Sequence, residues 1–399
     1  MVKKPVIRFN EYSDDWEDNK ISTFCTESNI LGHTGNEAKK LTVKLWGKGV
    51  VEKNEIGSEN TQYYFRKTGQ FIYSQLDFLN SAFAVIPEEF DGYESTHDLP
   101  AFDVNNMNPY FLFFRVIQES FYQKNGNVAN GSRKAKRIYA EDFLEMKINN
   151  PQIDEQNEIA SFFLYICKLI NSTQEKLDKT LILKKSMLEK MFPQNDAKIP
   201  ELRFKGFTGE WNKKKLSDYL DVVTEKNIYE QYGKEDVLSV SGDFGVVNQI
   251  EFQGKSLAGA SLVNYGVVHT GDVVYTKSPL KEQPYGIIKT NKGKTGIVSA
   301  LYGVFRKNSE INTDFIQYYF ESDRRLNEYL RPLVNKGAKN TLLVSDEDSL
   351  KGIVYIPSIK EQEVIIQYFD ESSKLITNYR NELAKLKIIK KSLLQKMFV

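Results

Sequence analysis

Histidine and cysteine are scarce in this chain of 399 residues, which contains three histidines and two cysteines. Cys25 and Cys167 cannot build a disulfide framework, and the scattered histidines offer neither a metal-ligand cluster nor a nucleophile–base pair. A run of about 18 apolar residues is missing, and the first residues form no apolar signal core. We therefore expect a cytoplasmic protein without a metal site, a secretion signal or a membrane span.

A strong charge of one sign is also missing. The 54 lysines and arginines are balanced by 53 acidic residues, which leaves a net charge of +1. This balance excludes a uniformly basic nucleic-acid binder but allows local basic patches. Hydrophobic residues make up 41% of the chain, enough to fill more than one core.

The main positive feature is an internal repeat. The segment PVIRFNEYSDDWEDNKIS begins at Pro5, and the similar segment PELRFKGFTGEWNKKKLS begins at Pro200. Each copy closes with a second matched block, PQIDEQNEIASFF from Pro151 and PSIKEQEVIIQYF from Pro357. Because the ends match while the middles diverge, we predict a common frame that holds two different surfaces.

Each copy is predicted to be an α/β globular region followed by helices. Apolar runs such as Phe71-Ile-Tyr73 and Asp272-Val-Val-Tyr275 predict short strands, separated by glycine and asparagine turns. Further matched segments are Gly49-Val-Val51 with Gly245-Val-Val247, and the expected helical runs 109–123 with 314–330.

A long helix without glycine or proline is predicted at the end of each copy, at 172–192 and 373–398. In copy two, Ser358 to Glu361 fits a capping box where the closing block opens a helix. Apolar residues recur at heptad spacing in both long helices, interrupted by Lys184 and Lys390, which favours a coiled-coil-like pair over a surface helix. The residues expected at the helix pair or at a partner interface are Ile170, Leu177, Met187, Met191, Ile376, Tyr379, Leu383, Leu386, Leu393 and Met397.

The repeat also predicts the domain organisation. The first long helix is followed within a few residues by Pro200, so by pseudo-symmetry the second should end near Pro5. The expected fold is a mixed α/β (α+β) protein in which two long antiparallel helices join two globular domains in a pseudo-two-fold, nearly circular arrangement. The predicted segments are globular domains 1–150 and 196–356 and helical regions 151–195 and 357–399.

This arrangement resembles the specificity subunits of Type I restriction–modification enzymes. The resemblance is carried by the Phe…Trp blocks at 9–16 and 204–211, the Pro-x-Ile-x-Glu-Gln blocks and the Lys-Lys-Ser…Met-Phe helices, and it covers essentially the whole chain. It implies two target recognition domains that each read one half of an asymmetric split DNA site. It also implies a complex with two adenine methyltransferase subunits that use S-adenosylmethionine, and with restriction–translocase subunits that use ATP and Mg²⁺. No cofactor is implied for this chain.

Signals for catalysis within the chain are weak. Asn108-Pro-Tyr110 lacks the second proline of an adenine methyltransferase loop, and it predicts the start of a helix instead. Gly293-Lys-Thr295 resembles the end of a phosphate-binding loop but lacks its first glycine, and Glu145-Met-Lys147 has no evident acidic partner strand. We predict a non-catalytic subunit. The alternatives are a self-contained DNA methyltransferase or nuclease, and a coiled-coil scaffold that does not bind DNA.

Basic, glycine-containing loops at equivalent places are the candidates for phosphate contacts, with solvated charged turns as the alternative. They comprise Arg133, Lys134, Lys136 and Arg137 in copy one, and Lys336, Lys339 and Asn340 in copy two.

Polar residues that follow equivalent strands are the candidates for base contacts. By donor–acceptor geometry, Gln75 could contact adenine and Lys277 guanine, while core or turn roles remain the alternative. The full candidate set is Tyr73, Ser74 and Gln75 in copy one, and Tyr275, Thr276, Lys277 and Ser278 in copy two.

Overall fold

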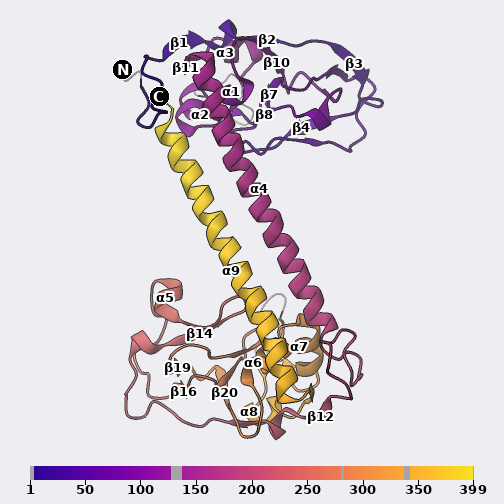
Figure 1. The fold of residues 1–399 in the computed structure, drawn as a ribbon, viewed down its shortest axis with the longest axis vertical. Coiled ribbons are helices and arrows are strands. Elements are labelled where there is room, and N and C mark those ends of the chain that lie inside the picture. Colours follow the sequence, from indigo (N-terminus) through magenta and orange to yellow (C-terminus); the bar gives the residue numbers. More distant parts are fainter. Residues whose placement is uncertain (1–3, 127–136, 280–282, 337–341, 399) are drawn as a thin grey trace. The chain divides into compact units, whose positions relative to one another are not determined.

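The computed structural model describes residues 4–126, 137–279, 283–336 and 342–398 (Figure 1). The chain forms two compact units. Unit 1 comprises Met1–Gln174 together with Asn381–Val399, and unit 2 comprises Glu175–Arg380. Each unit therefore contains part of both long helices, so the helical regions are not domains of their own. Within the described ranges, no helix is long and apolar enough to cross a membrane.

Unit 1 is built around an antiparallel four-stranded sheet. Its strand order is β2 (Cys25–Glu27), β10 (Ala101–Val104), β7 (Phe71–Tyr73) and β8 (Phe83–Val85). On one face of β7, the rings of Phe71 and Tyr73 pack on Phe143, with ring centroids 5.4 and 4.9 Å apart. On the other face, Ile72 joins a separate apolar cluster that includes Leu41. Protein therefore covers both faces of this sheet.

Smaller elements surround the sheet of unit 1. Two antiparallel pairs are formed by β1 (Glu17–Lys20) with β11 (Lys147–Asn150) and by β4 (Leu41–Val43) with β5 (Val50–Glu52). A three-stranded antiparallel sheet has the order β3 (Leu31–Thr34), β6 (Gln62–Phe65) and β9 (Glu94–Ser95). The short helices are α1 (Pro109–Val116), α2 (Glu119–Gly126) and α3 (Ala140–Leu144). As predicted, Asn108 starts a helix: its side-chain oxygen accepts hydrogen bonds from the backbone N–H groups of Tyr110 and Phe111.

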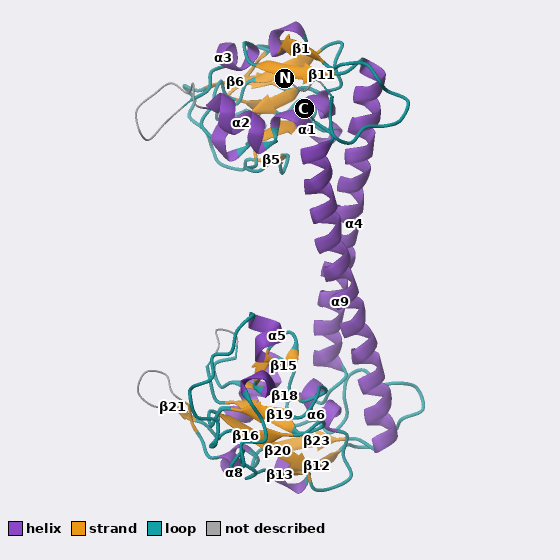
Figure 2. Ribbon diagram, turned by 90° about the vertical axis from the view of Figure 1, so that its left-hand side faces the viewer, coloured by secondary structure: helices purple, strands orange, loops and turns teal. Residues whose placement is uncertain are grey.

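Unit 2 repeats this plan. Its four-stranded sheet has the order β13 (Leu220–Val222), β20 (Tyr302–Lys307), β17 (Val273–Thr276) and β18 (Ile287–Thr290). The other strand pairs are β12 (Asn212–Lys215) with β23 (Ile353–Ile356), β14 (Leu238–Ser241) with β15 (Gly245–Asn248), β16 (Gly266–Val268) with β19 (Gly296–Val298), and β21 (Asn335–Lys336) with β22 (Leu342–Leu343). The helices are α5 (Gln249–Gln253), α6 (Thr313–Tyr319), α7 (Asp323–Leu330) and α8 (Asp346–Ser349). Figure 2 shows these strands grouped together, with the long helices along one side.

Two of the predicted helices differ from the structure. The helical runs expected at 109–123 and 314–330 are each broken into two helices, α1 with α2 and α6 with α7. In unit 2 the break lies at Ser322, whose hydroxyl accepts a hydrogen bond from the Arg325 N–H and caps α7. A new cap within the run therefore starts a second helix.

The long helices α4 (Ile153–Lys190) and α9 (Ile359–Lys396) each have 38 residues, more than predicted. The closing block and the last helix of each copy form one continuous helix. α9 begins directly after Ser358, as predicted, and the carboxylate of Glu361 forms a two-pronged ion pair with Arg203, at 2.7 Å for both hydrogen bonds. Arg8 and Glu155 form the equivalent pair in unit 1, also at 2.7 Å.

The glutamine of the repeated Glu-Gln block has a structural role as well. The Gln156 side-chain oxygen accepts a hydrogen bond from the N–H of Asn108 at 3.1 Å, and Gln362 accepts one from the N–H of Asn312 at 3.0 Å. The long helix of each copy is thus tied to the helix that packs beside it. The repeated motif residues therefore stabilise the common frame.

The long helices run antiparallel within each unit. In unit 2, Lys184 donates a hydrogen bond to Ser373, and Phe192 packs on Phe369 with ring centroids 5.9 Å apart. In unit 1, the N–H of Ile7 donates to the carbonyl oxygen of Lys396 at 2.9 Å, which confirms that α9 ends near the start of the chain.

The apolar seam predicted on the long helices is confirmed by burial. Leu177, Met191, Ile376, Leu383 and Met397 are buried, and Ile170, Met187, Tyr379, Leu386 and Leu393 are half-buried.

Candidate nucleic-acid interface

Most of the predicted phosphate-binding loop residues lie outside the described part of the chain. These are Arg133, Lys134, Lys136, Lys339 and Asn340. The guanidinium group of Arg137 forms an ion pair with Asp98. The backbone of Lys336 belongs to β21 and pairs with Leu342. The role of these loops therefore stays a prediction.

The base-reading role predicted for three residues of copy one is wrong in this structure. Tyr73 is fully buried, and its hydroxyl donates to the carbonyl oxygen of Ile138 at 2.9 Å. Burial raises the pKa of the Tyr73 hydroxyl above its ordinary value. Ser74 and Gln75 are also buried, and the Gln75 amide donates to the carbonyl oxygen of His97 at 2.9 Å. Side chains used in this way cannot reach a base edge.

The same correction applies to most of the set in copy two. Tyr275 is fully buried and donates to the carbonyl oxygen of Tyr285 at 2.7 Å, and Thr276 is buried. The ammonium group of Lys277 lies 2.7 Å from a carboxylate oxygen of Asp346, in a half-buried ion pair. Ser278 is the one residue of this set that is neither buried nor held in an ion pair, and it is half-exposed. The physical reason is that β7 and β17 are central strands covered on both faces.

Equivalent clefts lie between a hairpin tip and the long helices in both units. The cleft of unit 2 has a volume of about 1040 Å³, and that of unit 1 about 430 Å³. Matching positions line both, but their side chains differ: Thr290, Gln317 and Ser373 in unit 2 correspond to Val85, Phe113 and Cys167 in unit 1. The same frame thus supports clefts with different side chains in the two units.

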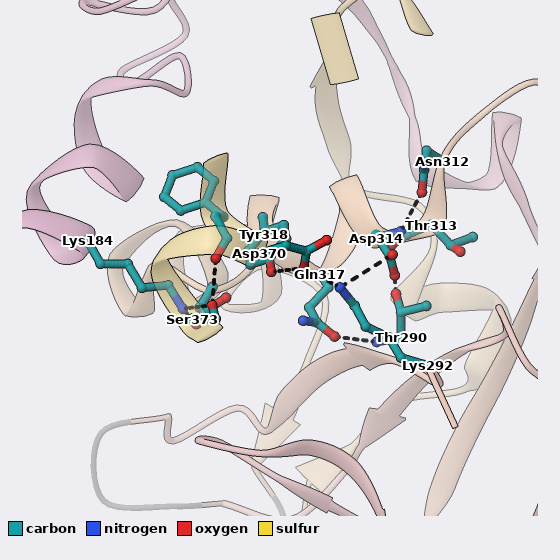
Figure 3. A network of polar contacts seen from close by, with 12 residues as sticks. Lys184, Thr290, Lys292, Asn312, Thr313, Asp314, Gln317, Tyr318, Asp370 and Ser373 are labelled. Carbon is teal, nitrogen blue, oxygen red and sulfur yellow. Dashed lines mark hydrogen bonds and ion pairs between the residues drawn. The ribbon is translucent and has the colours of Figure 1, made fainter. Parts of the chain in front are cut away.

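The cleft of unit 2 contains a network of polar contacts (Figure 3). Lys184 on α4 pairs with Glu321 at 2.7 Å, and Lys292 pairs with Asp370 on α9 at 2.8 Å. The Gln317 side-chain oxygen accepts a hydrogen bond from the N–H of Thr290 at 3.1 Å. These contacts fix the two long helices to the sheet and α6. The seam lysine Lys184 therefore has a structural partner in Glu321.

Lys390, the equivalent seam lysine of unit 1, is placed differently. Its ammonium group lies over the ring of Phe114, 5.9 Å from the centroid, as Lys184 lies over Tyr318 at 5.7 Å. Tyr318 and Phe114 occupy equivalent positions on α6 and α1. A cation at this seam position therefore contacts an aromatic ring in both copies.

A buried lysine also lines the cleft of unit 2. Lys289 on β18 is 5% exposed, and its ammonium group forms no hydrogen bond or ion pair with a residue of the described ranges. Burial lowers the pKa of its ammonium group, while the nearby carboxylate of Glu321 acts in the opposite direction. The equivalent residue in unit 1 is Ala84. A buried cation without a direct partner reduces the stability of the fold.

We expect Lys289→Met to stabilise unit 2 at pH 7, because methionine fills the same space without a charge. In the native protein, stability should rise with pH between the lowered folded pKa and the unfolded value of about 10.4, since the unfolded state binds more protons there. The variant should lose this dependence. Urea unfolding at pH 7 to 9 tests this, with the exposed Lys294→Met as control. Equal pH slopes in native protein and variant would contradict it.

Among the described residues, no three His, Cys, Asp or Glu side chains gather as possible metal ligands. Gly293 lies in the turn between β18 and β19, where its N–H donates to the Asn291 side chain, as the sequence predicted.

Cys25 is buried, which raises the pKa of its thiol to about 12. Such a thiol is a poor nucleophile or metal ligand.

Comparison with known proteins supplies relatives in sequence and in fold, although no protein-family model matches the chain. The chain is 22% identical, over 307 residues, to a Methanocaldococcus jannaschii protein named as the specificity subunit of the type I restriction enzyme MjaX. The match covers 73% of this chain and 67% of that protein.

Solved structures are similar over almost the whole chain. The S subunit of the type I restriction–modification system from M. genitalium matches with a TM-score of 0.60 and 12% identity, covering 99% of both chains. The HsdS subunit from Thermoanaerobacter tengcongensis matches with a TM-score of 0.45 and 16% identity, covering 98% of both chains. The fold is thus shared with the M. genitalium S subunit, and the resemblance predicted from the sequence is confirmed.

Proposed function

We propose that this chain is the DNA-specificity subunit of a type I restriction–modification complex and reads an asymmetric bipartite site, one half-site per target recognition domain. The observation that carries the proposal is the repeated frame around two different surfaces. The Arg–Glu pairs, the Asn–Gln bonds and the four-stranded sheets match between units. The elements around them differ: unit 1 has the three-stranded β3-β6-β9 sheet, whereas the described part of unit 2 has the two-stranded β16–β19 pair.

Base contacts are to be sought in those differing elements and in the loops, because the central strands are buried. Phosphate contacts would come from the basic loops that contain Arg133 and Lys339. Such contacts position the protein on DNA but carry no sequence information. Each unit would then present its own set of base contacts on a common support.

Exposed apolar residues on the long helices support the proposed scaffold for partner subunits. Ile182 and Leu183 on α4 are exposed, and so are the equivalent Ile388 and Ile389 on α9. Matched patches on an internally repeated protein suit two copies of one partner. We infer that these partners are methyltransferase subunits, to which restriction–translocase subunits add. S-adenosylmethionine, ATP and Mg²⁺ would then bind to the partners, and this chain would be non-catalytic.

The test is to map N6-methyladenine across a genome in cells that express the methyltransferase subunit with and without this chain. Methylation at a two-part site should require both proteins. The purified chain incubated with S-adenosylmethionine and DNA should transfer no methyl group. Methyl transfer by the chain alone would support a self-contained methyltransferase instead. A complex that shows no salt-dependent DNA binding would support a scaffold without DNA contact.

A further inference from the structure

The tip of the β4–β5 hairpin presents an exposed tryptophan. Trp46 is 56% exposed, whereas Trp16 is 1% and Trp211 2% exposed. These are the three tryptophans of the chain. Trp16 and Trp211 occupy equivalent places in the two cores, and Trp46 packs in neither. Its exposure therefore needs an explanation other than packing.

The backbone holds Trp46 in a conformation that bulky residues rarely adopt. Its φ is +62°, and that of Gly47 is +61°. The N–H of Trp46 donates to the carbonyl oxygen of Asn80 at 2.9 Å, and that of Gly47 to Ser81 at 2.8 Å. A side chain at Gly47 would lie only 3.2 Å from Ile117. The tip is thus fixed against the body of unit 1, and such maintained strain is typical of functional positions.

Positive charge surrounds the tryptophan. Lys44 and Lys48 are exposed on either side of it. Trp46, Lys48 and the half-buried Lys390 line the cleft of unit 1, together with Tyr110 and otherwise uncharged residues, and none of the lining residues is acidic. An aromatic ring beside cations, without competing carboxylates, fits a base or sugar with its phosphates.

The equivalent hairpin of unit 2 also presents an aromatic residue at its tip, at a different position and in different surroundings. Phe244 at the tip of β14–β15 is 57% exposed and contacts the exposed Phe252, with ring centroids 5.4 Å apart. Its neighbour is Asp243 rather than a lysine. An exposed aromatic therefore recurs at both tips, while the lysines belong to copy one alone.

We propose that the β4–β5 tip is a DNA-contacting element, in which the Trp46 ring stacks on a base or deoxyribose while Lys44 and Lys48 bind the flanking phosphates. This inference rests on the proposed function and adds the element that contacts DNA. A two-stranded hairpin fits a DNA groove, and apolar side chains of groove-binding proteins commonly insert against base steps. A protein partner is disfavoured, because Lys44 and Lys48, which form no ion pair with a described residue, would have to be desolvated.

Tryptophan fluorescence tests the contact directly. The full chain, with its methyltransferase subunits, is titrated with a 40-base-pair duplex that carries the methylation site mapped as above. The difference between native protein and Trp46→Phe isolates the signal of Trp46. We expect DNA to quench this signal and to protect it from acrylamide. Protection by the methyltransferase subunits without DNA would overturn the proposal in favour of a protein contact.

Affinity measurements on labelled DNA provide a second readout. Trp46→Ala should weaken binding about 5- to 150-fold, whereas Trp46→Phe should stay close to native. Lys48→Gln should lower the salt slope by about 0.9. Val6→Ala, an exposed apolar residue in the repeated block of unit 1, is the control and should bind normally.

Folding of each variant is checked from the unchanged emission of the buried Trp16 and Trp211. Native affinity of Trp46→Ala with an unquenched Trp46 would overturn the hairpin contact while leaving the proposed function intact. Absence of DNA binding by the native complex would overturn both.

Discussion

Phe398→Ala is expected to lower the free energy of unfolding of unit 1 by about 3–5 kcal/mol, although the residue is the last but one of the chain. Phe398 is buried, and its ring packs on Trp16, Phe111 and Phe163 with centroids 6.1, 5.4 and 5.9 Å apart. Removing the ring leaves a cavity between α9, α4 and the first globular region. The end of the chain therefore stabilises its beginning.

A matched variant exists in unit 2. Phe192 packs on Trp211, Phe315 and Phe369 with centroids 6.1, 5.5 and 5.9 Å apart. Phe192→Ala should destabilise unit 2 by a similar amount and leave the unfolding of unit 1 largely unchanged. The buried tryptophans report on the units separately, since Trp16 belongs to unit 1 and Trp211 to unit 2.

The measurement is denaturant unfolding of single-tryptophan variants, with Trp46→Phe in both to remove the exposed ring. Phe398→Ala should shift the Trp16 transition, and Phe192→Ala the Trp211 transition. If Phe398→Ala left the Trp16 transition at its native midpoint, the packing of the chain end in unit 1 would be contradicted. A shift of both transitions by either variant would instead show that the units unfold as one.

The sequence predicted the parts of the fold that depend on periodic patterns. Heptad spacing identified the seam residues, such as Leu177 and Leu383, which are buried. The repeat offset placed the end of α9 near the start of the chain, as the Ile7–Lys396 hydrogen bond shows. The long helices extend beyond the predicted starts at Ser172 and Ser373, because neither glycine nor proline interrupts α4 or α9.

Contacts between distant residues could not be predicted from one sequence. Arg8 and Glu155 are 147 positions apart, so their pairing in the frame has no local signal, although both belong to repeated blocks.

The base-reading residues were predicted wrongly for another reason. A short apolar run does not show whether one face of a strand or both are covered, and Tyr73 and Tyr275 lie on central strands with both faces covered.

The hairpin tip was missed although its sequence carried a signal. Lys44-Leu-Trp-Gly-Lys48 combines a glycine turn, an aromatic ring and two lysines, directly before the matched Gly49-Val-Val51 segment. Its exposure and its left-handed backbone are properties of the folded chain, set by the hydrogen bonds that the tip donates to the carbonyl oxygens of Asn80 and Ser81. Burial and backbone conformation therefore identify functional candidates that sequence composition alone does not distinguish from ordinary turns.

Under the proposed function, replacing residues 1–150 by the first domain of a known type I specificity subunit is expected to change one half of the methylated site completely and leave the other half and its methylation intact. The reason is that the contacts with the frame involve residues that recur in both copies. Residues 1–150 meet the frame through the Arg8–Glu155 pair, the Asn108–Gln156 bond and an apolar cluster in which Trp16 packs on Phe398. A donor domain that keeps arginine, asparagine and tryptophan at these positions should therefore fold on the existing helices.

Exchange of residues 196–356 is the matched control, since it meets the frame through the equivalent Arg203–Glu361 and Asn312–Gln362 contacts. It should change the other half-site alone. Mapping methylation after each exchange tests this expectation. A further variant, in which the donor domain lacks the arginine at the position of Arg8, separates folding from recognition. That variant should lose methylation at every site, because the buried Glu155 carboxylate is left without its partner. If either exchange altered both half-sites together, each target recognition domain could not be an independent reader, and the repeated frame would need another explanation.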